Sequence, residues 1–400
     1  MLLGRLGQGG LTVTGLAMTT QPDIGLKPFH AMEMVALAQE IEASGRVVCH
    51  LEVGEPAVPP APHVIEAVRA ALPEPQRYTA SKGMPELREA LARYYESQHG
   101  VSVDPQSIMV TMGSSAGFIL AFHAAFRPGA RIAVTRPGYP AYLNTLDGLG
   151  FRAVEIPVTA AAGWRLTGAD IEAAYAREPF EGLLFASPAN PTGAAVDRAG
   201  LAEIVATCSR LGVRLLSDEI YHGLDYRGPS VSALELTRDA IIINSFSKYY
   251  CMTGWRVGWM VLPDDLVRRT EMLQQNFFIS APSLSQIGAR VALGERDYSE
   301  EQKARYAENR RVLNAGLRQL GLDAGHEADG AFYAYADVSS FTNDSLAFSK
   351  ELLNVAAVAA TPGVDFDRVD GNRFVRFSYA GSRQTIEEAL ERIAGFLKGR

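Results

Sequence analysis

The chain has 400 residues, of which 47% are hydrophobic and 21% are charged, a composition typical of soluble globular proteins. The formal net charge of −7 argues against nucleic acid or an anionic membrane as the main partner, and no apolar run reaches the length of a membrane span. Three cysteines without a paired short spacing and seven scattered histidines predict neither a disulfide framework nor a metal site, and they favour a reducing, cytoplasmic environment.

The N-terminal part is expected to begin with an irregular segment. Residues 1–27 are rich in glycine and lack a clear cleavage site, so they are interpreted as a flexible leader, with Met18 as an alternative start. Apolar residues at helical spacing predict a helix over 31–44, and residues 47–53 predict a strand that runs into Gly54. Two helices with a tyrosine between them follow: 64–72, Tyr78 and 85–99.

Between residues 108 and 262, short apolar runs alternate with helical patterns. The runs are interpreted as buried strands because they are brief, aliphatic and bounded by glycine, proline or polar residues. They cover residues 108–111, 131–135, 182–186, 213–216, 241–243 and 257–262. This alternation predicts an α/β domain with a mostly parallel sheet that helices cover on both faces.

The part of the chain after Pro263 predicts a second, smaller lobe of mixed helices and strands. The expected helices lie within 263–293, with a break near Ser280, and over 299–320, 345–355 and 385–397, and the expected strands cover 331–336 and 374–379. A chain of this length exceeds one comfortable core. We therefore expect a leader at 1–27, a large cofactor-binding α/β domain at 61–290, and a small α+β domain made of 28–60 and 291–400.

Polar residues gather where the predicted strands of the large domain end. They are Gly113-Ser114-Ser115, Tyr139, Asn190, Asp218 with Tyr221, Ser245 with Lys248, and Arg256 shortly after them. Because open α/β sheets hold their ligands beyond the carboxyl ends of the strands, we expect these residues to surround one site. A partly desolvated lysine amine in such a place can lose its proton, as a Schiff-base lysine must.

The chemistry of this set suits a phosphorylated aldehyde cofactor. Asp218 ends an apolar strand and would be costly to bury unpaired, so a cationic ring nitrogen is a fitting partner. Asn190 and Tyr221 can donate hydrogen bonds to a phenolate oxygen, and Tyr139 can stack on a planar ring. The serine hydroxyls, the start of a helix at Gly113 and the Arg256 guanidinium suit a phosphate.

Each of these residues also has an ordinary structural explanation. Lys248 could be a solvated loop residue, and Asp218 could occupy a surface turn or cap the N-terminus of a helix. The Asn190-Pro191-Thr192-Gly193 stretch could form a tight turn, and Gly113-Ser114-Ser115 could serve only to cap a helix. Tyr139 suits a hydrophobic core. The shared position at strand ends, rather than any single motif, favours the functional interpretation.

The combined pattern resembles the class I/II aminotransferases, which are pyridoxal-phosphate enzymes of the aspartate aminotransferase fold (fold type I). The resemblance extends from Gly54 to about Arg376 and preserves the order and spacing of the motifs. It implies a seven-stranded, mostly parallel sheet and a homodimer with active sites at the subunit interface. It also implies transfer of an amino group between an L-amino acid and a 2-oxo acid through a Schiff base on Lys248.

The resemblance also implies a role for each site residue. Lys248 would carry the cofactor and move the proton, Asp218 would pair with the ring nitrogen, and Tyr139 would lie against the ring. Asn190 and Tyr221 would bind the 3′-oxygen. The phosphate would be held by Gly113, Ser114, Ser115, Ser245, Arg256 and, from the neighbouring subunit, Tyr78. Arg376 and Gly54, together with Asn190, would bind the substrate α-carboxylate, although Arg376 also suits a surface ion pair.

Two departures from the family pattern concern the substrate. Residues Ala57-Val58-Pro59-Pro60 stand where many family members carry an Asp-Phe pair, which predicts a different entrance to the site. No arginine is placed to bind a second carboxylate, so the pattern does not imply specificity for aspartate.

Three other functions remain as alternatives at this point. A lyase on the same scaffold, of the C–S β-lyase or cyclopropane-carboxylate-synthase kind, would use the same lysine, aspartate and arginine. A non-catalytic regulatory copy of the fold is disfavoured because Lys248 and Arg376 occur together. A dinucleotide-dependent oxidoreductase would need a glycine-rich loop at the first βα turn, and none follows a strand there.

Overall fold

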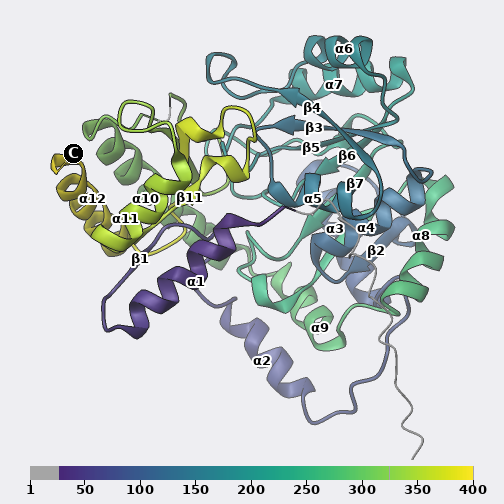
Figure 1. The fold of residues 1–400 in the computed structure, drawn as a ribbon. Helices are drawn as coiled ribbons and strands as arrows, with labels where there is room; N and C mark the ends of the chain where they lie inside the picture. Colours follow the sequence, from purple (N-terminus) through teal and green to yellow (C-terminus); the bar gives the residue numbers. More distant parts are fainter. Residues whose placement is uncertain (1–26, 324, 400) are drawn as a thin grey trace, which may run out of the picture.

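The computed structural model describes residues 27–323 and 325–399, so the predicted leader and Met18 lie almost wholly outside the described residues. Figure 1 shows a large lobe built around a sheet and a smaller lobe that carries the C-terminus. The division at residues 60/61 and 290/291 stays a prediction, although the main sheet falls between residues 108 and 261.

The large lobe contains the seven-stranded sheet, and the fold prediction is confirmed. The strand order is β2-β8-β7-β6-β5-β3-β4. The strands are β2 (Ile108–Thr111), β3 (Arg131–Arg136), β4 (Arg152–Pro157), β5 (Gly182–Ala186), β6 (Arg214–Asp218), β7 (Ile241–Ser245) and β8 (Gly258–Val261). β8 runs antiparallel to both of its neighbours, β2 and β7, whereas the other strand pairs of this sheet are parallel. Its N-terminal end therefore lies at the same edge as the carboxyl ends of the other strands, which brings Arg256 close to Lys248.

Helices cover both faces of this sheet, as the buried strands require. The helices of this lobe are α2 (Pro62–Ala71), α3 (Pro85–His99), α4 (Gly113–Ala125), α5 (Pro140–Gly148), α6 (Gly168–Arg177), α7 (Arg198–Leu211), α8 (Asp264–Phe277) and α9 (Ser283–Ala292). Of these, α2 packs against α9 and not on the sheet. Along β7, Ile241 and Ile243 join the apolar cluster that contains α4, whereas Ile242 joins the opposite cluster with α7. This alternation is the period of two expected of a strand.

The smaller lobe combines two short sheets with helices. The helices are α1 (His30–Ala43), α10 (Arg296–Gln319), α11 (Ser345–Ala356) and α12 (Arg383–Lys398). An antiparallel sheet has the order β11 (Thr361–Pro362), β12 (Phe374–Ser378), β9 (Tyr333–Asp337), and β1 (Cys49–His50) pairs with β10 (Val358–Ala359). In Figure 1 the arrowheads of β3 and β4 point toward the side on which α11 and α12 lie.

Two sequence expectations differ from the structure. The strand predicted over 47–53 is only two residues long, because its ladder with β10 covers Cys49 and His50 alone. The rest of that segment is extended and bonded elsewhere, as when Ser378 donates its N–H to the Leu51 carbonyl at 2.7 Å. The sequence expectations also omit β4 and α5–α7, whose exposed positions interrupt the apolar pattern.

No helix in residues 27–323 or 325–399 has the length and apolar character that crossing a bilayer requires.

Candidate active site

The residues predicted at the strand ends surround a single cavity of about 220 Å³. Its walls include many of the predicted site residues: Gly54, Ser114, Ser115, Tyr139, Asn190, Asp218, Tyr221, Lys248, Arg256 and Arg376. They come from the ends of β5, β6 and β7, the start of α4, the turn before β8, and β12 of the smaller lobe. The cavity therefore draws on both lobes.

Lys248 follows β7 and extends into this cavity. Its Nζ donates a hydrogen bond to the Gly54 carbonyl at 2.5 Å. Burial lowers the pKa of Lys248 to about 8, and the positive charge of Arg376 adds to the shift. A solvated loop lysine would have neither property. At mildly alkaline pH much of this amine is unprotonated and able to act as a nucleophile or base.

Asp218 is the last residue of β6 and is 3% exposed. Its Oδ2 accepts a hydrogen bond from Tyr142 Oη, and its Oδ1 accepts one from the Ile220 N–H at 3.1 Å. Burial raises the pKa of Asp218 to about 6, against these hydrogen bonds and the charge of Lys248. No helix begins here, so Asp218 is not an N-cap. A buried carboxylate without an ion-pair partner among the described residues suits a cationic ligand group.

Arg376 lies in β12 and is 4% exposed, so the surface ion pair considered above is wrong. Its Nη1 donates to Asn190 Oδ1 at 2.9 Å, and its Nη2 donates to the Glu52 carbonyl at 2.5 Å. The guanidinium carbon lies 4.4 Å from the ring centre of Tyr333. Within the described part of the chain it makes no ion pair with a carboxylate. This arrangement fits a guanidinium held ready for an anionic ligand.

Gly54 is required for reasons of space as well as for its carbonyl. A Cβ on this residue would lie 1.8 Å from Tyr333 Oη, so any side chain would displace the tyrosine. Tyr333 Oη in turn shares a hydrogen bond with Tyr221 Oη at 2.8 Å. Sequence reasoning missed Tyr333, because an aromatic residue within a strand carries no distinguishing signal.

The polar end of the cavity lies at the start of α4. Ser114 and Ser115 occupy the first turn, and no side chain caps this helix, so simple capping does not explain the two serines. A Cβ on Gly113 would lie 2.5 Å from Arg256 Nη2, so the glycine makes room for the guanidinium. Free helix N–H groups, hydroxyls and a guanidinium together form an anion site.

The two serines that follow β7 differ in position. Ser247 belongs to the same predicted motif but had no predicted role, and it lines the cavity, whereas Ser245 does not line it. Ser245 Oγ donates to Ser247 Oγ at 2.8 Å and therefore contacts the cavity only through its neighbour.

Tyrosines line the side of the cavity near Asp218. Tyr139 lies in the wall, with its ring edge-on to Tyr142 at 5.4 Å between centres. Tyr142 belongs to α5, which the sequence did not predict, and its bond to Asp218 could not be anticipated. Tyr78 is 82% exposed and does not line the cavity, so its role in a neighbouring subunit stays a prediction.

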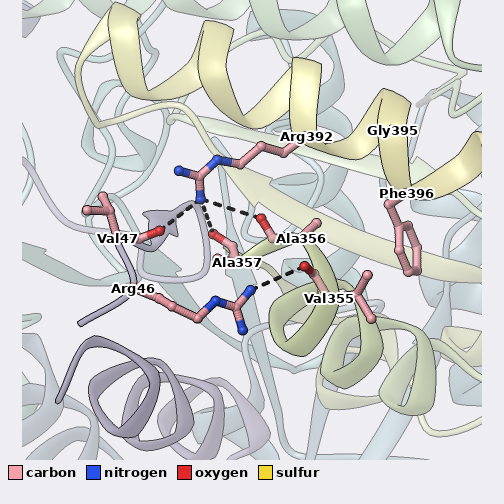
Figure 2. A pocket seen from close by; sticks show the side chains of 8 residues that line it. All are labelled: Arg46, Val47, Val355, Ala356, Ala357, Arg392, Gly395 and Phe396. Atoms are coloured by element: carbon pink, nitrogen blue, oxygen red, sulfur yellow. Dashed lines mark hydrogen bonds between the residues drawn. The ribbon is translucent and has the colours of Figure 1, made fainter. Parts of the chain in front are cut away.

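A different cavity, of about 510 Å³, opens on the smaller lobe between α11 and α12 (Figure 2). It contains two arginines, but both are engaged with backbone carbonyl groups. Arg392 donates to Val47, Ala356 and Ala357, and Arg46 donates to Asn354 and Val355. These bonds stabilise the C-terminal end of α11, so the arginines have a structural role there.

Comparison with known proteins agrees with the geometry of the cavity. The profile of the family "Aminotransferase class I and II" matches residues 46–393. The chain belongs to this family. A valine–pyruvate aminotransferase from Mycobacterium tuberculosis is 45% identical over 378 residues, which are 93% of this chain and 97% of the relative. An aspartate/prephenate aminotransferase from Thermus thermophilus is 31% identical over 382 residues, which are 93% of this chain and 97% of that protein.

Solved structures of other aminotransferases have the same fold as this aminotransferase. A crystal structure of an aminotransferase from Mycobacterium tuberculosis superposes with a TM-score of 0.91 at 43% identity and covers 94% of this chain and 98% of its own. The Thermus thermophilus aspartate aminotransferase with maleate has a TM-score of 0.87 at 31% identity, covering 93% and 97%. These relatives support aminotransferase activity and give no support to the lyase alternative. The family is generally dependent on pyridoxal phosphate.

Proposed function

We propose that this aminotransferase depends on pyridoxal 5′-phosphate held in the 220 Å³ cavity, with Lys248 as the residue that bonds to it. The observation that carries the proposal is the shared cavity. A lysine with a lowered pKa, a buried carboxylate and an anion site at a helix N-terminus line the same space.

The residues present fit this cofactor. Ser114, Ser115 and Arg256, with Ser245 supporting Ser247, would hold the phosphate, and the Gly113 position leaves space for the guanidinium. Asp218 would bind the ring nitrogen, and Tyr139 would lie against the ring. Asn190 and Tyr221 would bind the phenolic oxygen.

When bound, the cofactor supplies an aldehyde carbon that reacts with amines and a protonated ring that withdraws electrons. Residues of the protein would bind and orient the substrate and transfer the proton. Arg376 and the backbone of Gly54 would hold the substrate α-carboxylate, which fixes the orientation of the α-carbon. Lys248, once free of the cofactor, would take the α-proton at its Nζ and would deliver it to the former aldehyde carbon of the cofactor, on the other side of the transferred nitrogen. The buried wall around Asp218 would exclude water from its charge.

Three further properties belong to the same proposal. The protein is a homodimer in which Tyr78 of one subunit reaches the phosphate site of the other. Its partners are small molecules, an L-amino acid and a 2-oxo acid, without nucleic acid or membrane partners, and it is cytoplasmic. The relatives carry names for several substrates, among them valine with pyruvate, aspartate, and aspartate with prephenate, and their names alone do not choose between these substrates.

The proposal is tested by adding pyridoxal phosphate to the purified protein and measuring amino transfer. We expect a yellow protein that converts amino donors to oxo acids only when pyruvate or 2-oxoglutarate is supplied, with equal amounts of the two products. A panel of amino acids with each acceptor gives the measurement. Absence of any cofactor absorbance would contradict the proposal, as would release of ammonia and pyruvate without an acceptor.

A further inference from the structure

Tyr142 is a buried tyrosine that bonds to the carboxylate of the proposed cofactor site. It lies in the first turn of α5, is 5% exposed, and lines the cavity. Its Oη donates a hydrogen bond to Asp218 Oδ2, and Asp218 Oδ1 accepts a hydrogen bond from the Ile220 N–H at 3.1 Å. Each oxygen of the carboxylate therefore has a donor from the protein, and the two donors together fix its orientation.

The packing of Tyr142 explains its aromatic ring but not its hydroxyl group. The ring lies edge-on to Phe118 and Tyr139, with centres 5.3 and 5.4 Å apart, and it belongs to the apolar cluster on this face of the sheet. A phenylalanine would make the same ring contacts. A hydroxyl group buried here costs free energy unless it is hydrogen-bonded, and Asp218 supplies that bond.

The hydroxyl of Tyr142 also favours the charged form of Asp218. The other titratable side chains near this carboxylate are Lys248 after β7, Tyr139 just before α5, and the neighbouring Glu219. Burial raises the pKa of Asp218 to about 6, and the hydrogen bond from Tyr142 is the strongest influence that lowers it, ahead of the charge of Lys248. Burial raises the pKa of Tyr142 well above its usual value, so its hydroxyl keeps the proton that it donates.

We propose that Tyr142 is a positioning residue, whose hydroxyl group orients the Asp218 carboxylate and keeps it in the charged form that a protonated ring nitrogen requires. The consequence for catalysis rests on the proposed function, because the ring nitrogen belongs to the cofactor. Without the hydroxyl, the carboxylate would hold a proton more strongly, and less of it would be ready to pair with a cation at neutral pH. The bond between Tyr142 and Asp218 does not itself depend on the cofactor.

The first test follows the titration of Asp218 in the cofactor-free protein. Thermal unfolding from below pH 5 to above pH 8 gives the stability gained by Asp218→Asn in the wild-type and Tyr142→Phe backgrounds. The gain rises with pH until the pH passes the folded-state pKa of Asp218, because ionisation of the buried carboxylate opposes folding. We expect it to level off near pH 6 in the wild type and about one pH unit higher in Tyr142→Phe, which loses a hydrogen bond to a charged group.

Tyr249→Phe is the matched control for this comparison. Tyr249 is also buried and donates a hydrogen bond to a carboxylate, Glu300 Oε1 at 2.7 Å, but it does not line the cavity. This substitution should leave the titration of Asp218 unchanged. An unchanged titration in Tyr142→Phe, or an equal shift in Tyr249→Phe, would overturn the inference. If Tyr142→Phe does not fold, Tyr142→Met removes the same hydroxyl and takes its place, since methionine fills irregular apolar space.

The second test measures binding of pyridoxamine 5′-phosphate, which carries the ring nitrogen but has no aldehyde to react with Lys248. The increase in Kd from pH 8 to pH 6 should be about fivefold larger for Tyr142→Phe than for the wild type, because Asp218 in the empty site is then protonated at a higher pH. Equal increases in the two proteins would contradict the inference. If pyridoxamine phosphate binds neither protein, the proposed function fails, and the unfolding measurements still decide the role of Tyr142.

Discussion

Replacement of Lys248 by alanine should lower kcat by about 10⁴-fold, while the variant keeps pyridoxal phosphate bound without a covalent link. The loss follows because Lys248 is the only lysine of the described residues that lines the cavity, and a positioned general base alone contributes up to about that factor. Binding should persist because Ser114, Ser115 and Arg256 are unchanged. Steady-state kinetics and the absorbance spectrum of the loaded variant give the two measurements.

Lys350→Ala provides the control for this variant, since Lys350 is an exposed residue of α11 outside the cavity. It should have wild-type activity and the wild-type spectrum. Substantial turnover in Lys248→Ala would contradict the assignment of the base.

Asp218→Asn should lower kcat by about 10³-fold, because an amide cannot supply the negative charge that keeps a ring nitrogen protonated. Kinetics of the variant loaded with pyridoxal phosphate test this effect. Asp225→Asn is the matched control: Asp225 is also a buried carboxylate with a raised pKa, but it does not line the cavity. The control should keep most of the activity, and equal losses in both variants would contradict a specific role for Asp218.

The same substitution should not destabilise the cofactor-free protein. Burial raises the folded-state pKa of Asp218 from 3.8 to about 6, so its ionisation opposes folding. Its contribution to stability is therefore greatest below the unfolded pKa and declines as the pH rises through about 6. At pH 7.5 the asparagine variant should be more stable by up to about 3 kcal/mol, and the gain should shrink as the pH falls below 6. Thermal unfolding across this range measures it.

The sequence predicts the sheet and the edge of the sheet that carries the site, because short continuous segments of the chain contain the patterns that indicate them. Ile241–Ile243 is apolar throughout and Lys248 follows it, so both the strand and the position of the lysine can be inferred from a few residues. The same holds for Asp218 after β6. The prediction that these residues meet needs only the rule that carboxyl ends of parallel strands share one edge.

The contacts that complete the cavity join distant parts of the chain. Arg376 and Asn190 are 186 positions apart, and Tyr142 and Asp218 are 76 apart, so no local pattern links them. The sequence did not predict Tyr333 as a site residue. Its ring fits beside the cavity only because Gly54, far away in the sequence, has no side chain. The strand near Cys49 was predicted too long because apolar character indicates burial, whereas ladder length depends on the partner strand.

The most direct measurement of the central claim is chemical identification of the lysine that bonds to the cofactor. The protein is loaded with pyridoxal phosphate, reduced with borohydride, digested and analysed by mass spectrometry. The account predicts a stable phosphopyridoxyl group on the peptide that contains Lys248 and no comparable labelling elsewhere. An unlabelled Lys248, or a predominant label on another residue such as Lys82, would contradict it.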